Sequence, residues 1–444
     1  HNHLAIDHHS RVTSIFPLTQ ANGILYNGQW VLDTTPVSFD RPIDLGATHL
    51  VVRRDAVDAI PDLAATLGRT SQGTISFNRP PRNIESDPSP TISIPTLPTP
   101  SMSQTVFGWA GFLAPLLLGI AMAVLYNPLF ALFALLSPVM VLASWWENRR
   151  RDRKMSLANH RRTRAVQRQL AAAAQQWASV HGLWLRRRFP DPAEVIGRTT
   201  LPSVRLWERR LTHDDSLQLV VGYCSQQGHP KLQSEGPIPD ELAAMVAQNC
   251  RLDSVPFEIS LDAGRCIGLV GPRSVTLAMA NSLLIQTTTL HGPADVSVVA
   301  LLATTAAAEW DWLHWLPHTA GHQVGLNTRT IATSAEGCGQ LAADLCEKAH
   351  SATQTTVVLI DGNDLVTDRH SPGRLLLAQG GGPTSGIVIA NSVHDLPAAC
   401  TEVICVTDID GIVEITQPAS GQCQRGVLMA GVSRQTATQA AQAL

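Results

Sequence analysis

One stretch of the sequence has the setting of a nucleotide-binding loop. In GRCIGLVGPRSVTLAMANSLLIQ, an apolar run leads into a glycine-containing turn, and a helix-forming run follows. A P-loop of the form GxxxxGK, followed by Ser or Thr, cradles phosphates with backbone N–H groups, neutralises their charge with the Lys and holds Mg²⁺ with the hydroxyl. Aligning the helix with such loops places Thr276 at the Lys position and Leu277 at the hydroxyl position. Both chemical groups are therefore missing.

A second stretch, TTVVLIDGND, has the pattern of the strand that carries a metal-binding aspartate in such enzymes. It supplies an apolar run and then Asp361, but Gly362 follows where a hydrolytic motor usually places a carboxylate. We expect this segment to contain no catalytic residue, no metal site and no cofactor of its own, with vestigial nucleotide binding left open. The predicted degenerate nucleotide site consists of Gly268, Gly271, Arg273, Ser274, Thr276 and Asp361.

Two further clusters have weaker chemical signals. His314, His318 and His322 lie four residues apart, which on a helix would align three imidazoles for zinc, but Pro317 breaks that helix. Gly380 to Gly382 could wrap an anion, but a plain loop is favoured there. The neighbouring tryptophans are expected to be core and interface aromatics, including buried ones whose loss would unfold the domain: Trp310, Trp312 and Trp315.

The elements around these motifs predict the architecture. Strand-like and helix-like runs alternate over residues 255–444, which predicts a P-loop-like α/β domain with a parallel sheet. Residues 147–254 form a helical stalk and connecting region in this interpretation. The stalk sequence is rich in Ala, Gln and Arg, lacks Gly and Pro until Gly182, and is expected to continue from the apolar run before it.

Residues 105–146 contain two apolar runs separated by Asn127-Pro128, and neither run contains a charged residue. At ~1.5 Å per residue each is long enough, or nearly so, for the ~30 Å hydrocarbon core of a bilayer. This pattern predicts a transmembrane hairpin. An excess of cations marks the cytoplasmic side, so both flanks are expected to be cytoplasmic. The cations that follow the hairpin are Arg149, Arg150, Arg151, Arg153, Lys154, Arg161, Arg162 and Arg164.

Residues 1–78 alternate short β-type runs with turns, which predicts a β-sandwich. The runs HLAID, ANGILYNG and PIDLGATHLVVR resemble the second half of a forkhead-associated (FHA) domain. Of that family's motif only Asn22 and Gly23 carry over, since the Arg and Ser that grip phosphate lie mostly upstream of His3 and are absent from this chain. A docking role and phosphothreonine binding both stay open. Residues 79–104 form a Pro-rich linker, expected to tether the sandwich loosely.

The composition fits a mostly soluble protein with one membrane anchor. The net charge of −3 gives no indication of a nucleic-acid partner, and none is expected. Eight cysteines all follow the hairpin without a CxxC pair, which indicates reduced thiols. The chain opens on His1 without a signal peptide, so we interpret it as a piece of a longer protein.

Four ordered motifs carry a family resemblance. RLWERRLTHDDSLQLVVGY, then GLVGPRSVTLA with LHGPADVSVV, then WDWLHWLPH and finally GVSRQTATQAAQAL resemble the stalk and degenerate first domain of FtsK/SpoIIIE-type membrane ATPases of type VII (ESX/WXG100) secretion systems. The resemblance covers about residues 100–444. It implies that the parent protein carries three tandem ATPase domains that bind ATP and Mg²⁺, forms a hexamer and receives WXG100-type substrate proteins.

The resulting prediction is a multidomain segment of an ATP-driven protein-export motor in the bacterial cell membrane. The full-length protein would be an ATPase, whereas these residues would be non-catalytic. Its partners would be other membrane subunits of the secretion complex, further copies of itself, the lipid bilayer and, through the implied downstream domains, the substrates. Two alternatives stay open: a DNA translocase of the FtsK/SpoIIIE type, and a membrane signalling scaffold that uses the FHA-like module.

Overall fold

The computed structural model of the protein divides into two compact units. The first comprises residues 1–84, 189–224 and 256–444, and the second residues 85–188 and 225–255. From residue 130 onwards the structure describes all residues except 201–204, 235, 349–353, 379–383 and 408–410. Before residue 130 it describes residues 4–9, 12–18, 23–26, 29–38, 42–45, 48–52, 67–69, 75–77, 79, 81–82, 84, 86–95, 117, 121, 124 and 125.

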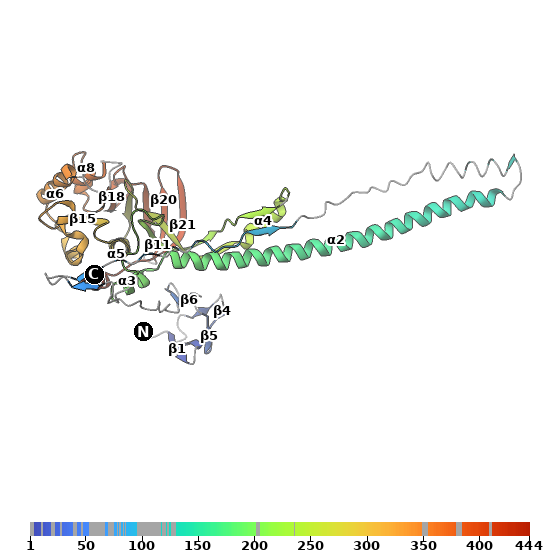
Figure 1. Ribbon diagram of the computed structural model, residues 1–444, viewed down its shortest axis with the longest axis horizontal. Helices are drawn as coiled ribbons and strands as arrows, with labels where there is room; N and C mark the ends of the chain where they lie inside the picture. Colours follow the sequence, from blue (N-terminus) through green and yellow to red (C-terminus); the bar gives the residue numbers. More distant parts are fainter. Residues whose placement is uncertain are drawn as a thin grey trace. The chain divides into compact units, whose positions relative to one another are not determined.

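The first unit is built on a ten-stranded mixed sheet (Figure 1). The six strands from β19 to β16 pair in parallel, whereas β11, β21, β20 and β19 pair in antiparallel fashion. The predicted α/β domain with parallel strands is confirmed. In spatial order the strands are β13 (Arg251–Ser260), β11 (Gln218–Gln227), β21 (Gln422–Met429), β20 (Ile412–Gln417), β19 (Glu402–Val406), β14 (Cys266–Val270), β18 (Thr384–Ala390), β17 (Thr355–Asp361), β15 (Val296–Leu302) and β16 (Ile331–Ala332).

Two apolar clusters explain why the central strands read as continuous hydrophobic runs. All seven residues of β15 and of β17 are buried, as expected for parallel strands covered on both faces. One cluster includes residues of α5, α9 and η2, and the other includes residues of α6 and α8. The helices of this unit are α3 (Pro192–Thr200), α5 (Arg273–Leu290), α6 (Ala335–Lys348), α7 (Asp364–Thr367), α8 (Pro372–Ala378) and α9 (Arg434–Ala443), with short 3₁₀ helices η2 (Ala307–Trp315), η3 (Pro317–Thr319), η4 (Gly321–Val324) and η6 (Val393–Asp395).

Helix α5 is buried along nearly its whole length although it carries several polar residues. The Gln286 amide accepts from the Val220 N–H at 2.8 Å and donates to the Val220 carbonyl at 2.9 Å, so it satisfies both backbone groups of one β11 residue. The hydroxyls of Thr287 and Thr288 donate to carbonyls four residues back. Internal hydrogen bonds thus allow a partly polar helix to lie in the core.

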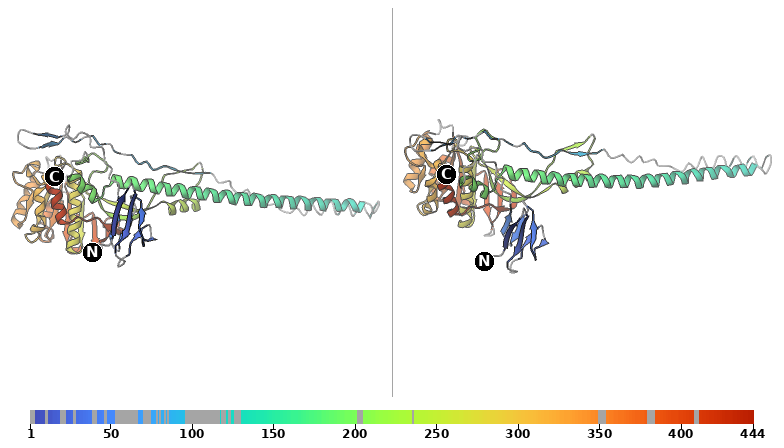
Figure 2. Two further views of the ribbon diagram at one scale, coloured as in Figure 1. Left: turned by 90° about the horizontal axis from the view of Figure 1, so that it is seen from below. Right: turned by 60° about the horizontal axis from the view of Figure 1, so that its bottom comes forward.

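The N-terminal residues of the first unit form two small antiparallel sheets around one apolar core, drawn in blue in Figure 2. This arrangement agrees with the predicted β-sandwich. Asn22 lies outside the described residues, and Gly23 has a φ of +54°, in the left-handed region that favours glycine. Neither observation tests the FHA identity, which stays a prediction. The strands are β1 (Leu4–His9), β2 (Val12–Pro17), β3 (Leu25–Tyr26), β4 (Gln29–Trp30), β5 (Thr35–Val37), β6 (Pro42–Leu45) and β7 (Thr48–Val51), followed by the β8 (Leu67–Arg69) and β9 (Ile75–Phe77) pair.

The second unit is organised by one helix, α2 (Phe130–Arg188), of 59 residues. At ~1.5 Å per residue it is ~88 Å long, and it runs without a break from the predicted second apolar span through the predicted stalk (Figures 1 and 2). Its C-terminal half packs with α4 (Asp240–Asn249) and with a parallel pair formed by β10 (Ile92–Ile94) and β12 (Leu232–Ser234).

The Pro-rich linker is not a loose tether over its described residues, and that prediction was wrong. Ile92 and Ile94 of β10 are 3% and 5% exposed and belong to the same apolar cluster as Trp177 of the stalk. Alternate residues of a strand point to one face, so two isoleucines in a Pro-, Ser- and Thr-rich sequence bury their side chains together while the strand backbone pairs with β12. On the first unit, Arg79 is paired with Asp295.

The first predicted membrane span lies almost entirely outside the described residues, as does the Asn127-Pro128 turn. Among the residues that the structure does describe, no helix combines the length and the apolarity that a membrane crossing requires. The hairpin stays a prediction.

Candidate functional site

The predicted P-loop-like turn joins β14 to α5. Strand β14 lies between β18 and β19, at the point where the order of the parallel strands reverses, which is where open α/β sheets bind ligands. Only Gly271 and Pro272 separate the strand from the helix, a much shorter connection than the glycine-rich loop that wraps a phosphate. A side chain at position 271 would place its Cβ 2.7 Å from the Val406 Cβ, so this glycine serves close packing.

The residues proposed for the lysine and hydroxyl positions do not face a ligand. Thr276 is buried in the first turn of α5, where its hydroxyl donates to the Arg273 carbonyl at 3.0 Å. Leu277 packs against the core. Ser274 is exposed at the start of the helix. At position 268 a Cβ would lie 2.5 Å from Leu396 Cδ1, so this glycine is also set by packing.

Arg273, the first residue of α5, closes the site. Its guanidinium donates two hydrogen bonds to the Asp361 carboxylate, at 2.6 Å and 2.7 Å. It also bonds to Glu309, and the Trp310 indole N–H donates to Asp361 at 2.6 Å. The bidentate bond to Asp361 raises the pKa of Arg273 further above its usual value. Asp361 therefore ends β17 with both oxygens bonded inside the protein.

This geometry does not fit a bound Mg²⁺–nucleotide. The carboxylate that would contact the metal ion is only 4% exposed and is already neutralised by a guanidinium. The next position cannot take a carboxylate, because a Cβ on Gly362 would lie 2.9 Å from the Ala303 Cβ. The sequence included Arg273 in the site without a role. It missed Trp310, the first residue of the WDWLHW block, and Glu309, which immediately precedes that block.

The members of the predicted histidine cluster, and those of the tryptophan cluster, differ in burial. His318 is buried, and its Nε2–H donates to the His291 carbonyl at 2.8 Å, whereas His314 and His322 are exposed. No group of metal-ligating side chains gathers among the described residues. Gly380 to Gly382 lie outside them.

Trp310 and Trp312 are buried, but Trp315 is 58% exposed, so its prediction as a buried residue was wrong. Trp310, Leu313 and Leu316 are three residues apart and form a buried row, as the three-residue turn of η2 allows. Trp312 and Trp315 are also three residues apart, but only Trp312 is covered, because Trp315 is the last residue of η2.

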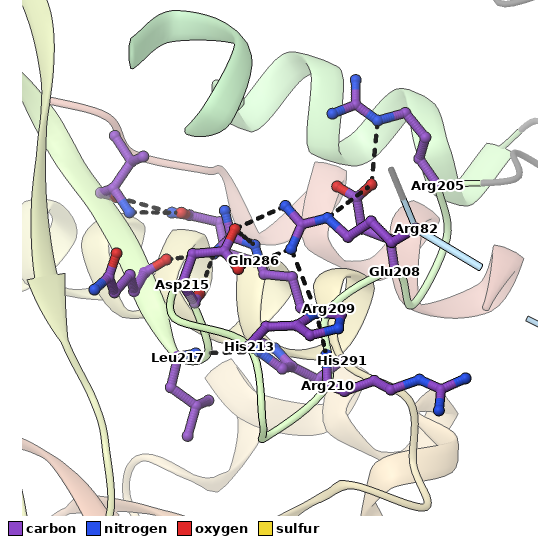
Figure 3. Close-up of polar contacts among 12 residues, drawn as sticks. Arg82, Arg205, Glu208, Arg209, Arg210, His213, Asp215, Leu217, Gln286 and His291 are labelled. Atoms are coloured by element: carbon purple, nitrogen blue, oxygen red, sulfur yellow. Dashed lines mark hydrogen bonds and ion pairs between the residues drawn. The ribbon is translucent and has the colours of Figure 1, made fainter. Parts of the chain in front are cut away.

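A second polar cluster, the buried arginine network, lies elsewhere in the same unit (Figure 3). Asp215 is 2% exposed and receives two hydrogen bonds from Arg82, both at 2.7 Å, and an ion pair from Arg209 at 3.3 Å. Burial lowers the pKa of Arg209 to about 10. The network consists of Arg82, Arg198, Arg205 and Arg209 with Glu194, Glu208 and Asp215.

The histidine beside this network is held neutral. His291 Nε2 accepts from the Leu217 N–H at 3.1 Å (Figure 3). Its Nδ1–H donates to the Thr287 carbonyl at 3.1 Å. Burial first, and the charge of Arg209 second, lower the pKa of His291 to about 3. Four charged residues of the RLWERRLTHDDS motif thus belong to the internal network, which the sequence did not reveal: Arg205, Glu208, Arg209 and Asp215.

The fold and the site together define an α/β domain of P-loop-like topology in which Asp361, at the end of β17, is paired internally. No protein-family model matches the chain. The chain is 26% identical over 187 residues to the ESX-4 secretion system protein EccC4 of Mycobacterium tuberculosis, which covers 39% of this chain and 15% of the relative. It is 22% identical over 270 residues to the type VII secretion system protein EssC of Staphylococcus aureus, covering 55% of this chain and 17% of that protein.

Among solved structures, EssC (ATPases 2 and 3) from Geobacillus thermodenitrificans is similar at 12% identity and a TM-score of 0.35, covering 53% of this chain and 50% of that one. The chain spans only 15% and 17% of the length of the two curated relatives. The predicted resemblance to type VII secretion proteins is confirmed by relatives named EccC and EssC.

Proposed function

We propose that this chain is the membrane-proximal, non-catalytic coupling segment of an ATP-driven motor of a type VII secretion system. The observation that carries the proposal is the closure of the degenerate nucleotide site by the Arg273–Asp361 pair. The curated relatives EccC4 and EssC support the secretion system rather than the alternative of a DNA translocase.

In this proposal residues 105–146 form a hairpin in the bacterial cell membrane, with both flanks cytoplasmic. ATP and Mg²⁺ are bound by further ATPase domains of the whole protein, which also receive WXG100-type substrates. The chain works as part of a homohexamer in contact with other membrane subunits. Helix α2 then links the membrane end to the α/β domain.

A closed site suits a coupling role for a physical reason. A motor domain that binds nucleotide must leave its phosphate loop and its metal-binding aspartate free for the ligand and must release the product in each cycle. Here Arg273 supplies the positive charge permanently, from the first turn of α5 to the end of β17. The domain can transmit force without opening around a ligand.

Isothermal calorimetry of the purified full chain with MgATP tests this proposal. We expect no binding in the micromolar range and no hydrolysis. A clear micromolar isotherm that disappears in Asp361→Ala would show a working nucleotide site and overturn the non-catalytic assignment.

A further inference from the structure

The part of α2 that follows the apolar run has no packing partner among the described residues. Every described side chain from Trp146 to Arg162 is exposed. A helix that is polar on all faces obtains little stability from its own chain and either bridges solvent or meets another surface. The composition of this segment indicates which surface that is.

Two tryptophans mark the start of the segment, and each is covered by an arginine one turn later. The Arg149 Cζ lies 5.0 Å from the Trp145 ring centroid, and the Arg150 Cζ lies 3.8 Å from that of Trp146. Helical side chains tilt toward the N-terminus, so both guanidinium groups reach back toward the apolar run. Tryptophan with arginine at the end of an apolar helix is the arrangement found at bilayer headgroups.

The cations between residues 149 and 168 of this helix fall into two groups of four, with one arginine left over. Arg151 is set apart because it is ion-paired with Glu147 at 2.6 Å. The proximal cluster consists of Arg149, Arg150, Arg153 and Lys154, and the distal cluster of Arg161, Arg162, Arg164 and Arg168. All eight side chains are exposed.

We propose that the proximal cluster, together with Trp145 and Trp146, binds the headgroups of anionic phospholipids. The inference rests on the proposed membrane anchoring and adds the lipid class and the residues that recognise it. At ~1.5 Å per residue the proximal cluster lies within ~12 Å of Trp146, comparable to the ~8 Å Debye length, whereas the distal cluster begins ~22 Å away. Only the proximal cluster is then close enough to feel the charge of the bilayer surface.

Nucleic acid is the less favoured occupant. Single-stranded nucleic acids are held by cations interleaved with aromatic platforms, and no Phe, Tyr or Trp occurs between residues 147 and 176. The two aromatic residues instead lie at the apolar end, beside the proximal cluster alone.

The lipid that stays with the full chain tests the proposal. The chain is reconstituted into bilayers of equal phosphatidylcholine and phosphatidylglycerol, extracted in neutral detergent, and the ratio of the two retained lipids is measured. We expect wild type to enrich phosphatidylglycerol roughly tenfold or more, since each basic residue near an anionic surface contributes ~1 kcal/mol.

Two variants with the same change in charge sharpen the measurement. Arg149→Gln, Arg150→Gln, Arg153→Gln and Lys154→Gln together should return the retained ratio to that of the bulk bilayer. The same exchange at Arg161, Arg162, Arg164 and Arg168 should leave the enrichment within about twofold of wild type, because screening weakens charges at that distance. Equal losses from both variants, or no enrichment by wild type, would overturn the proposal.

Two further observations separate this inference from the proposed function. If alkaline carbonate removes the full chain from cell membranes, the proposed anchor fails. If the chain stays in the membrane but shows no preference for phosphatidylglycerol, only the lipid assignment fails. Tight binding of a single-stranded oligonucleotide that depends on the proximal cluster, without a lipid preference, would assign the surface to nucleic acid instead.

Discussion

Two aspartates of the α/β unit, Asp361 and Asp215, are both held by arginine but in opposite surroundings. Asp361 ends a parallel strand at the ligand-binding edge of the sheet, and its partner Arg273 is 41% exposed. Asp215 is enclosed with Arg209, which is 1% exposed, and with Arg82. The first pair stands where a ligand would bind, whereas the second is part of the core.

The comparison shows that ion pairing alone does not identify a functional site. A buried pair is costly to break, because removing one partner leaves an uncompensated charge away from water. In the pair at the edge of the sheet, Asp361 is only 4% exposed but Arg273 is 41% exposed, so water already reaches the guanidinium and can reach the carboxylate once the guanidinium is removed. What makes Asp361 a candidate site residue is its position at the end of a parallel strand, where open α/β sheets bind ligands, and not the ion pair itself.

The largest expected effect is therefore at Asp215. Asp215→Ala leaves the guanidinium groups of Arg82 and Arg209 without their shared carboxylate and should lower the free energy of unfolding by about 3–5 kcal/mol. Urea unfolding of the full chain measures this loss. Asp311→Ala is the control, since Asp311 lies 3.8 Å from Arg434 in an exposed pair and should change stability by less than about 1 kcal/mol. If both variants lost a similar free energy of unfolding, the buried pair would contribute no more to stability than the exposed pair, and the comparison would be wrong.

Two tryptophans of η2 provide a test of packing on the Asp361 side. Trp312 is 1% exposed and Trp315 is 58% exposed. Trp312→Ala should cost about 3–5 kcal/mol, whereas Trp315→Ala should cost less than about 1 kcal/mol. The two variants make the same chemical change three residues apart, and thermal unfolding compares them directly. A large loss from Trp315→Ala would mean that another chain or domain covers it.

The outcome at Trp315 shows where the sequence was informative. The apolar run before Asp361 and the Gly271 turn predicted a strand–turn–helix and a second strand, because continuous apolar runs of that length indicate buried parallel strands. Which residues of a short 3₁₀ helix are buried depends on the chain that covers them: Trp312 and Trp315 lie one turn apart, yet only Trp312 is covered. No local pattern carries that information. The exposure of Trp315 could not be read from WDWLHW.

Long-range pairing was equally inaccessible. Arg273 and Asp361 are 88 residues apart, and they meet because β14 and β17 lie on either side of β18. The docking of β10 combines backbone pairing with β12 and the burial of Ile92 and Ile94, within a segment whose composition otherwise indicates extended chain. Composition averages over such short segments and conceals them.

The buried histidines predict an intermediate effect of pH. Burial lowers the pKa of His291 to about 3 and that of His318 to about 4, from 6.5. Between pH 6.5 and about 4 the unfolded chain binds protons that the folded chain does not, so the free energy of unfolding falls as the pH falls. From pH 7 to pH 5 we expect a loss of about 2 kcal/mol per histidine.

Urea unfolding at the two pH values measures this loss, and His291→Gln is the informative variant. Its stability should depend less steeply on pH over this window than that of wild type. An unchanged pH dependence in His291→Gln would show that other groups are responsible.

The smallest expected effect is at the closed site itself. Arg273→Ala removes the guanidinium from Asp361, but Asp361 keeps its hydrogen bond from Trp310 and gains access to water. We therefore expect a loss of about 1 kcal/mol, well below that of Asp215→Ala. Arg434→Ala is the matched control at an exposed pair and should cost less still.

The opened site should still not bind MgATP, because the turn remains short and Thr276 and Leu277 supply neither a cation nor an accessible hydroxyl. Calorimetry on Arg273→Ala checks this directly: micromolar MgATP binding would mean that the arginine alone had been blocking an otherwise intact nucleotide site.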